Sequence, residues 1–203
     1  MNGTLTPQWV RPISNAEKGE LHAERFYANA KDRDPKLLDV IEIEFLRERR
    51  NGYRPEDCLV NSRKNWEKLG VYPRNRLISA IEEPQDGLWL DGESSSNGRN
   101  DKIPASFACN LTSTLKLVQP KELEVWRQTE GQDFGRPRRT IRGQFRLGGN
   151  CYIFAITDPV IEREFNDRPE GSTIIIKEPI LCLSVSEMFE KQNACYKLIA
   201  SVI

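Results

Sequence analysis

The amino-acid sequence predicts a mostly β protein with minor α content, in which short strands are joined by tight turns and a few short helices. The segment Thr140–Leu147 alternates apolar and polar residues with a period of two, as a half-buried strand does. The turn residues Gly148-Gly149-Asn150 join it to an apolar, aromatic-rich segment, Cys151–Thr157, so the two are predicted to form a hairpin. In Thr157-Asp158-Pro159 a capping residue stands directly before a proline, which is typical of a helix start.

The other elements of the C-terminal half complete a known order. A strand at Leu123–Gln128 precedes the hairpin, and a short helix at Val160–Phe165 follows it. Two further strands, Ile180–Val185 and Cys195–Val202, are separated by a polar loop around Glu190–Asn193. Three strands, a helix and two strands are the order of an OB-fold, a small barrel that grips oligonucleotides in many proteins. An SH3-like barrel or a split sandwich would give a similar order, so these alternatives stay open.

The N-terminal half contains shorter elements. Lys36–Leu46 alternates, with its isoleucines and Phe45 facing inward, and is predicted to be one strand. Pro12 confines the apolar segment Trp9–Ile13 to a sheet edge or a strand end. The sequence further predicts helices at Gly19–Ala30, Ser62–Leu69 and Arg74–Glu82, and strands at Leu88–Leu90 and Leu115–Val118. Gln119-Pro120 is the predicted domain junction.

Composition limits the class of protein. A chain of 203 residues with 38% hydrophobic and 30% charged residues can form one large domain or two small ones. It contains no apolar run of about 20 residues and no signal peptide, so we expect a cytoplasmic protein without membrane partners. The five cysteines form no CxxC pair, which argues against a disulfide framework and a structural zinc site. Thirty acidic residues balance thirty basic ones, so any nucleic-acid binding must come from a local patch.

Landmarks along the whole chain are similar to those of one bacterial family. In the first half they are Trp9-Val10-Arg11-Pro12, Pro35–Val40, and Leu88–Gly92 followed by Ser94-Ser95 and Asn100-Asp101. In the second half they are Thr157-Asp158-Pro159, Leu181–Ser184 and Tyr196–Ala200. With these landmarks the chain resembles the bacterial dual OB-containing domain family, and their order is more specific than any single motif.

The resemblance implies both a fold and a function. The fold would be two tandem OB-like barrels with short connecting helices, one over residues 1–119 with a polar loop insertion and one over residues 120–203. Family members carry a strand before the Trp-x-Arg-Pro landmark, and this chain starts almost on it. The first barrel is therefore expected either to lack its opening strand or to start upstream. The function would be non-catalytic binding of nucleic acid or a nucleotide-derived ligand in a bacterial conflict system, directed against phages or mobile elements.

The residues give little support to catalysis. His22 is the only histidine, which excludes a two-histidine metal site within the chain and leaves a Ser-His-Asp triad dependent on one residue. No phosphate-binding loop or dinucleotide fingerprint is present. Glu42 and Glu44 could pair around a divalent cation, but outward alternation along a strand explains them without one. We therefore expect no enzyme activity, no catalytic residues, no metal and no cofactor.

Binding is predicted in a basic stretch, residues 136–146, that contains five arginines and no acid. Guanidinium groups along one sheet face suit bidentate contacts to phosphate, and aromatic side chains beside them would stack on bases. The alternative is a solvated strand whose arginines pair with Glu124, Glu130 or Glu162. The predicted nucleic-acid-binding residues are Arg138, Arg139, Arg142, Arg146 and Tyr152, with Phe154 and Trp126 as further stacking candidates.

A second candidate is the polar loop Asp91–Lys102, which contains Gly, Ser, Asn and Asp and no apolar residue. Its backbone amides and short polar side chains could bind a small nucleotide-like ligand, or they could satisfy one another within an ordered turn. The predicted ligand-binding residues are Asp91, Ser94, Ser95, Asn100 and Asp101. A third possibility is a scaffold that docks a protein effector from a neighbouring gene.

Overall fold

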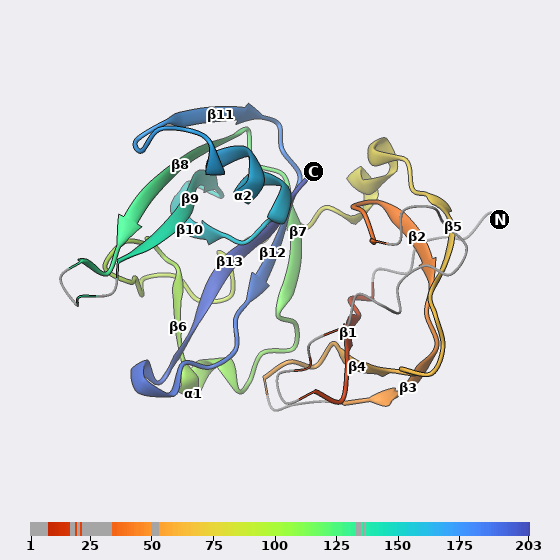
Figure 1. Ribbon diagram of the computed structural model, residues 1–203. Helices are drawn as coiled ribbons and strands as arrows, with labels where there is room; N and C mark the ends of the chain where they lie inside the picture. Colours follow the sequence, from red (N-terminus) through yellow and green to blue (C-terminus); the bar gives the residue numbers. More distant parts are fainter. Residues whose placement is uncertain are drawn as a thin grey trace. The chain divides into compact units, whose positions relative to one another are not determined.

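The computed structural model describes residues 8–16, 19, 21, 34–49, 53–132, 135 and 137–203, and in this part the chain is mostly β (Figure 1). The chain forms two compact units. The first contains the described residues up to Ala80 together with Thr112–Thr114, and the second contains Ile81–Leu111 and Leu115–Ile203. The division therefore differs from the predicted junction at Gln119-Pro120, because strands upstream of that junction pair with C-terminal strands.

The first unit contains two small sheets. One has the strand order β1-β4-β3 and the other pairs β2 with β5. The strands are β1 (Arg11–Ile13), β2 (Asp39–Glu42), β3 (Phe45–Glu48), β4 (Asp57–Val60) and β5 (Glu67–Val71), and a 3₁₀ helix spans Arg74–Ala80. As predicted for a segment with Pro12, β1 lies at a sheet edge. Buried Val60 and Trp66 pack against Leu21, Ile41 and Ile43.

Two predictions in the first unit are wrong in part or in full. Lys36–Leu46 forms β2 and the start of β3, which belong to different sheets, and Phe45 is exposed rather than inward. Ser62–Leu69 is not a helix, because its end belongs to β5, whose hydrogen bonds to β2 outweigh local helix propensity. The predicted helix at Arg74–Glu82 is the 3₁₀ helix. The predicted helix at Gly19–Ala30, with His22, falls almost entirely outside the described residues.

The second unit contains the remaining elements. Its strands are β6 (Lys102–Pro104), β7 (Leu115–Val118), β8 (Glu122–Glu130), β9 (Arg138–Leu147), β10 (Asn150–Ile156), β11 (Thr173–Lys177), β12 (Leu181–Val185) and β13 (Ala194–Val202). Its helices are α1 (Ala105–Ala108), α2 (Pro159–Asn166) and a 3₁₀ turn at Glu190–Gln192. The strand predicted at Leu88–Leu90 is absent, since these residues form a bend with Trp89 at a positive φ of 63°, although Leu88 is fully buried.

The strand order of this unit is that of the predicted barrel. The sheet runs β11-β8-β9-β10-β13-β12-β7, with β6 paired to β13 (Figure 1). β10 and β13 are parallel, whereas β8-β9-β10 form an antiparallel meander. β11 pairs with β8 at one end of the sheet and leads directly into β12, which pairs with β13. The chain therefore links the two sides of the sheet, as the fourth strand of an OB barrel does. The sequence patterns predicted neither β6 nor β11.

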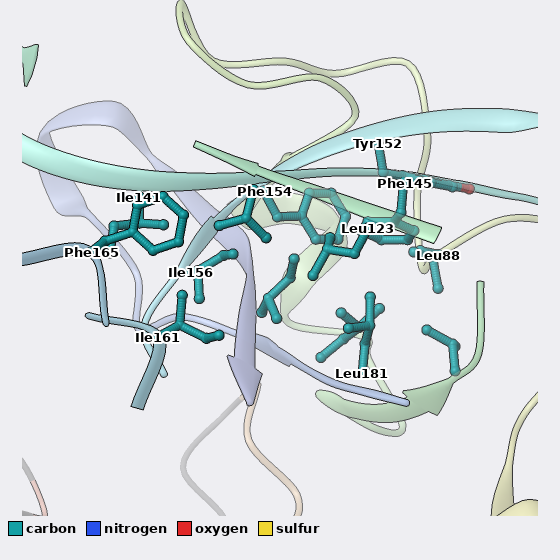
Figure 2. Close-up of a cluster of buried hydrophobic side chains, with 14 residues drawn as sticks. Leu88, Leu123, Ile141, Phe145, Tyr152, Phe154, Ile156, Ile161, Phe165 and Leu181 are labelled. Atoms are coloured by element: carbon teal, nitrogen blue, oxygen red, sulfur yellow. The ribbon is translucent and has the colours of Figure 1, made fainter. Parts of the chain in front are cut away.

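A hydrophobic cluster of 14 buried residues lies inside the second unit. Three rings from adjacent strands, Phe145, Tyr152 and Phe154, lie within 5.2 to 5.6 Å of one another. Ile161 and Phe165 of α2 close the end of the cluster near Ile141 and Ile156 (Figure 2). Because β9 presents every second residue to this interior, its other residues must lie on the outer face of the barrel.

Helix α2 begins as the sequence predicts. Asp158 is its N-cap, and one carboxylate oxygen accepts a hydrogen bond of 2.8 Å from the backbone N–H of Val160. The other oxygen accepts one from Val202 near the end of β13, also at 2.8 Å. Asp158 thus ties the helix start to the last strand, which is a structural role. No helix in the described part of the chain is long and apolar enough to cross a membrane.

Candidate functional site

The outer face of β8 and β9 carries three of the four arginines predicted to bind nucleic acid. Glu124 lies directly opposite Gln144 in the β8–β9 register, and Trp126 lies opposite Arg142. Arg146 lies two residues beyond Gln144 on the same face and is exposed. The predicted alternation of β9 is therefore confirmed, because its apolar residues point inward and its polar residues outward.

Arg142 is the exception among the outward-facing arginines, since it is buried. Its Nε and Nη2 atoms bind the two carboxylate oxygens of Glu130 at 2.8 and 3.1 Å, and Nη1 lies 3.4 Å from Asp101. Such a bidentate pair fixes both side chains and uses the donors that a phosphate would need. Of the predicted pairings with an acid, the one with Glu130 is present, and Arg142 serves the fold rather than offering a free guanidinium.

The same hydrogen-bond network orients Trp126. The indole N–H donates to Gln128 at 2.8 Å, and the amide of Gln128 donates to Glu130 at 2.8 Å. Burial by itself would raise the pKa of Glu130, but hydrogen bonds from Arg142 and Gln128 together hold it below its usual value. The carboxylate is therefore charged at neutral pH, and the ring of Trp126 is held on the outer face in one orientation.

Three predicted arginines remain accessible. Arg138, Arg139 and Arg146 are exposed, and within the described ranges their side chains form no ion pair or hydrogen bond. Arg138 lies opposite Glu130 in the register, but both oxygens of that carboxylate already bind Arg142. Arg136 lies outside the described residues. By the alternation of β9, Arg138 and Arg146 lie on the outer face, whereas Arg139 has the orientation of Ile141 and is exposed at the start of the strand. The basic patch is thus smaller than the sequence predicts.

Two of the aromatic candidates do not reach this face. Tyr152 and Phe154 point into the barrel and are fully buried, so neither offers a ring for stacking. The prediction that Tyr152 stacks on a base is corrected accordingly: position 152 lies opposite Phe145, on the inner side of the hairpin. Trp126, which is half-buried on the outer face, is the candidate that the structure leaves available.

Asp91 takes part in a polar cluster at the barrel wall. One of its oxygens accepts from the Tyr152 hydroxyl at 2.6 Å and from Asn150 at 3.0 Å, and the other lies 3.2 Å from the ammonium of Lys197. Lys197 is fully buried and also donates to the backbone carbonyl of Leu90. Burial lowers the pKa of Lys197, and the charge of Asp91 opposes that effect. The cluster anchors the start of the polar loop to the barrel.

The rest of the polar loop is likewise satisfied internally. Asp101 is buried and accepts from both the N–H and the hydroxyl of Ser95, at 2.7 and 2.6 Å. Asn100 accepts from Gly92 and donates to the carbonyl of Cys151, while its N–H donates to Ser94. These bonds match the interpretation in which the loop residues satisfy one another. Asp91, Ser94, Ser95, Asn100 and Asp101 are brought together, but their polar atoms are used in the fold.

The loop also completes the barrel wall. Arg99 exchanges two backbone hydrogen bonds with Ile153 of β10, at 3.0 and 3.1 Å. β6 then pairs with the first residues of β13. The segment therefore fills the space where β10 and β13 diverge, which explains why a stretch without apolar residues is ordered.

A second aromatic position was missed by the sequence analysis. The loop between β12 and β13 carries Phe189, which is 51% exposed and packs edge-on against Tyr196, with 5.3 Å between ring centroids. In OB barrels the loops between strands 1 and 2 and between strands 4 and 5 flank the ligand face. A phenylalanine in a loop that is otherwise polar except for Met188 was the signal that could have identified it.

A pocket of about 670 Å³ opens beside the same face. It lies between the segment that leads into β8 and the end of β9, with the hairpin turn at its rim. Its lining residues include Lys121, Glu122, Glu124, Gln144, Arg146 and Gly148. Among the described residues, no group of three or more His, Cys, Asp or Glu side chains could hold a metal ion.

Comparison with known proteins bears on the fold of the whole chain. No curated protein and no solved structure matches it significantly. One family model, described as the dual OB-containing domain, matches residues 2–202. The match covers almost every residue and agrees with the strand order of the second unit. The chain therefore belongs to the dual OB-containing domain family.

Proposed function

We propose that this protein is a non-catalytic module that binds single-stranded or structured nucleic acid on the outer face of its second unit. The observation that carries the proposal is the set of exposed arginines on β9, whose guanidinium groups are not engaged by the described part of the fold. Arg138 and Arg146 lie on the outer face, and Arg139 is exposed beside Arg138 at the start of the strand. Trp126 on the adjacent strand β8 supplies a ring for sequence-tolerant stacking, and Phe189 in the loop between β12 and β13 is a further exposed ring.

The charge balance supports a binding site of modest strength. With a formal net charge of zero, the chain has no general attraction for a polyanion, so affinity rests on a few local contacts. Each phosphate contact to a single strand contributes about 0.7 to the slope of log affinity against log salt. Two phosphate contacts, from Arg138 and Arg139, therefore predict a slope of about −1.4, which is shallow compared with that of a dedicated nucleic-acid-binding protein.

The context of the module is part of the same proposal. The sequence resemblance implies that members of this family belong to bacterial conflict systems. Membership in the family therefore supports a role as an accessory of an anti-phage or mobile-element defence locus in the cytoplasm. In that role the protein would present bound nucleic acid to a partner effector encoded nearby. Pull-down with products of neighbouring genes, with and without nuclease treatment, distinguishes a nucleic-acid bridge from direct protein contact.

The test is fluorescence anisotropy of labelled single-stranded DNA and RNA across a salt series. Arg138→Ala/Arg146→Ala should weaken binding and lower the salt slope by about 0.7, since Arg138 is the phosphate contact that is lost. The matched control removes two exposed arginines elsewhere, Arg76→Ala/Arg163→Ala, and should leave the affinity within about twofold. Absence of binding by the wild-type protein at low salt, or equal losses in both variants, would overturn the proposal.

A further inference from the structure

The pocket beside β8 and β9 is lined by polar side chains of opposite charge that have no hydrogen-bond or ion-pair partner among the described residues. Glu122 is already paired with Lys177 at 2.6 Å. Glu124, Gln144 and Arg146, by contrast, form no hydrogen bond or ion pair within the described ranges and all line the pocket. A carboxylate, an amide and a guanidinium that converge on one hollow without partners are typical of a site that reads a hydrogen-bonding ligand.

The sheet register sets the spacing of these three groups. Glu124 and Gln144 are directly opposite one another on adjacent antiparallel strands, which places their Cβ atoms about 5 Å apart. Arg146 is the diagonal neighbour of Glu124 on the same face, about 7 Å away. Together the three side chains span about the width of one nucleobase. They do not extend far enough to contact several successive phosphates of a strand.

The charges of the pocket favour a neutral ligand. Lys121 and Arg146 are offset by Glu122 and Glu124, so a phosphate inside the pocket would meet two carboxylates. A planar base that offers both donors and acceptors meets no such repulsion. The pocket therefore suits a base, while Arg138 and Arg139 lie outside it, where the strand backbone would run.

The carboxylate selects among the bases. Ionised Glu124 only accepts hydrogen bonds, so it is best satisfied by two adjacent donors. Guanine presents such a pair on its Watson–Crick edge, the N1–H and the exocyclic N2 amine, whereas adenine, cytosine and uracil present no two adjacent donors there. Guanine also carries the O6 and N7 acceptors, which suit the Gln144 amide and the Arg146 guanidinium.

We propose that this pocket binds a guanine base, with Glu124 accepting from N1–H and N2–H and with Gln144 and Arg146 donating to O6 or N7. For a base within a strand the inference rests on the proposed function, and it adds a sequence preference to it. A free guanine nucleotide presents the same chemistry.

The experiment measures binding of oligothymidylate that carries one central guanine, adenine or cytosine, and separately of GMP and AMP. The guanine strand should bind about tenfold or more tightly than the others, because one bidentate contact is typically worth that much. Glu124→Gln should abolish the preference yet retain the general affinity for oligothymidylate. Glu122→Gln, which changes a carboxylate of the same pocket that is paired with Lys177, should retain the preference.

The outcomes separate the two proposals. Oligonucleotide binding without a base preference, or a preference that persists in Glu124→Gln, would overturn the guanine site and leave the proposed function intact. Binding of GMP over AMP that depends on Glu124, without oligonucleotide binding, would support the site and overturn the proposed function. If neither oligonucleotides nor GMP bind, both fail.

Discussion

The guanidinium of Arg142 and the carboxylate of Glu130 form a two-pronged ion pair across β8 and β9, with N–O distances of 2.8 and 3.1 Å. Removing one member of a buried pair leaves an uncompensated charge and typically costs about 3–5 kcal/mol. We expect Arg142→Ala to destabilise the protein at the lower end of that range. Urea denaturation should show a clearly lower midpoint for this variant, whereas Arg146→Ala, four residues along the same face, should leave the midpoint almost unchanged. Equal effects would contradict the assignment of Arg142 to the fold.

Gly143 lies on the inner face of β9 where no side chain fits. A Cβ built there would lie 2.8 to 3.0 Å from methyl groups of Ile199, Leu123 and Ile156. Gly143→Ala should therefore destabilise the barrel by about 1–3 kcal/mol, as overpacking of a core does. Gly70→Ala is the matched control, because the space around Gly70 is open. Thermal melts of both variants decide the point, and a stable Gly143→Ala protein would argue against this packing.

The raised pKa of the Tyr152 hydroxyl predicts that the protein loses stability at high pH. Burial and the hydrogen bond to the charged carboxylate of Asp91 raise the pKa of its hydroxyl to about 12, against about 10 for an unfolded tyrosine. The folded state therefore keeps a proton that the unfolded state releases. This contribution is fully present below about pH 10 and is lost as the pH rises toward 12. Denaturation midpoints measured from pH 9 to 12 should fall more steeply for the wild type than for Tyr152→Phe. Parallel curves would contradict the buried Tyr152–Asp91 contact.

Asp158 joins the start of α2 to the end of β13. Asp158→Ala removes both acceptors, and we expect a cost of about 2 kcal/mol, since helix caps alone are worth about 1. Asp158→Asn keeps one acceptor oxygen and should recover about half of the loss. Asp167→Ala, at the exposed C-terminal end of the same helix, should have little effect. Chemical denaturation of the three variants measures their free energies of unfolding. An equal loss of stability for Asp158→Ala and Asp167→Ala would contradict the role of Asp158 in joining α2 to β13.

Most strands of the second unit were predictable because each of them carries its own pattern. Alternation along β9, the glycine turn after Leu147 and the Asp158-Pro159 start of α2 are local signals, and all three are confirmed. β11 was missed because Thr173–Lys177 is short and its three isoleucines are consecutive, with no alternation to reveal it. In the first unit, pairing between distant strands determined the structure, so the end of Ser62–Leu69 became part of a strand despite its helix-like composition.

The candidate site was only partly predictable for a related reason. The sequence places Arg142 and Arg146 on the same face of the strand. It does not show that Arg142 forms ion pairs with Glu130 and Asp101 while Arg146 stays exposed. Likewise the side chain of Tyr152 points inward because its strand pairs in one register, and a shift by one residue would have turned it outward. Tertiary contacts, rather than residue type, decide which charges remain free.

The central claim is that nucleic acid binds the outer face of β8 and β9. Backbone amide shifts of the full chain, followed by NMR while a guanine-containing oligothymidylate is added, test it most directly. The account predicts that the largest changes fall in residues 122–128 and 138–149, and that they disappear in Arg138→Ala/Arg146→Ala. Changes confined to residues 92–100 or to the first unit, with the β9 amides unmoved, would contradict it.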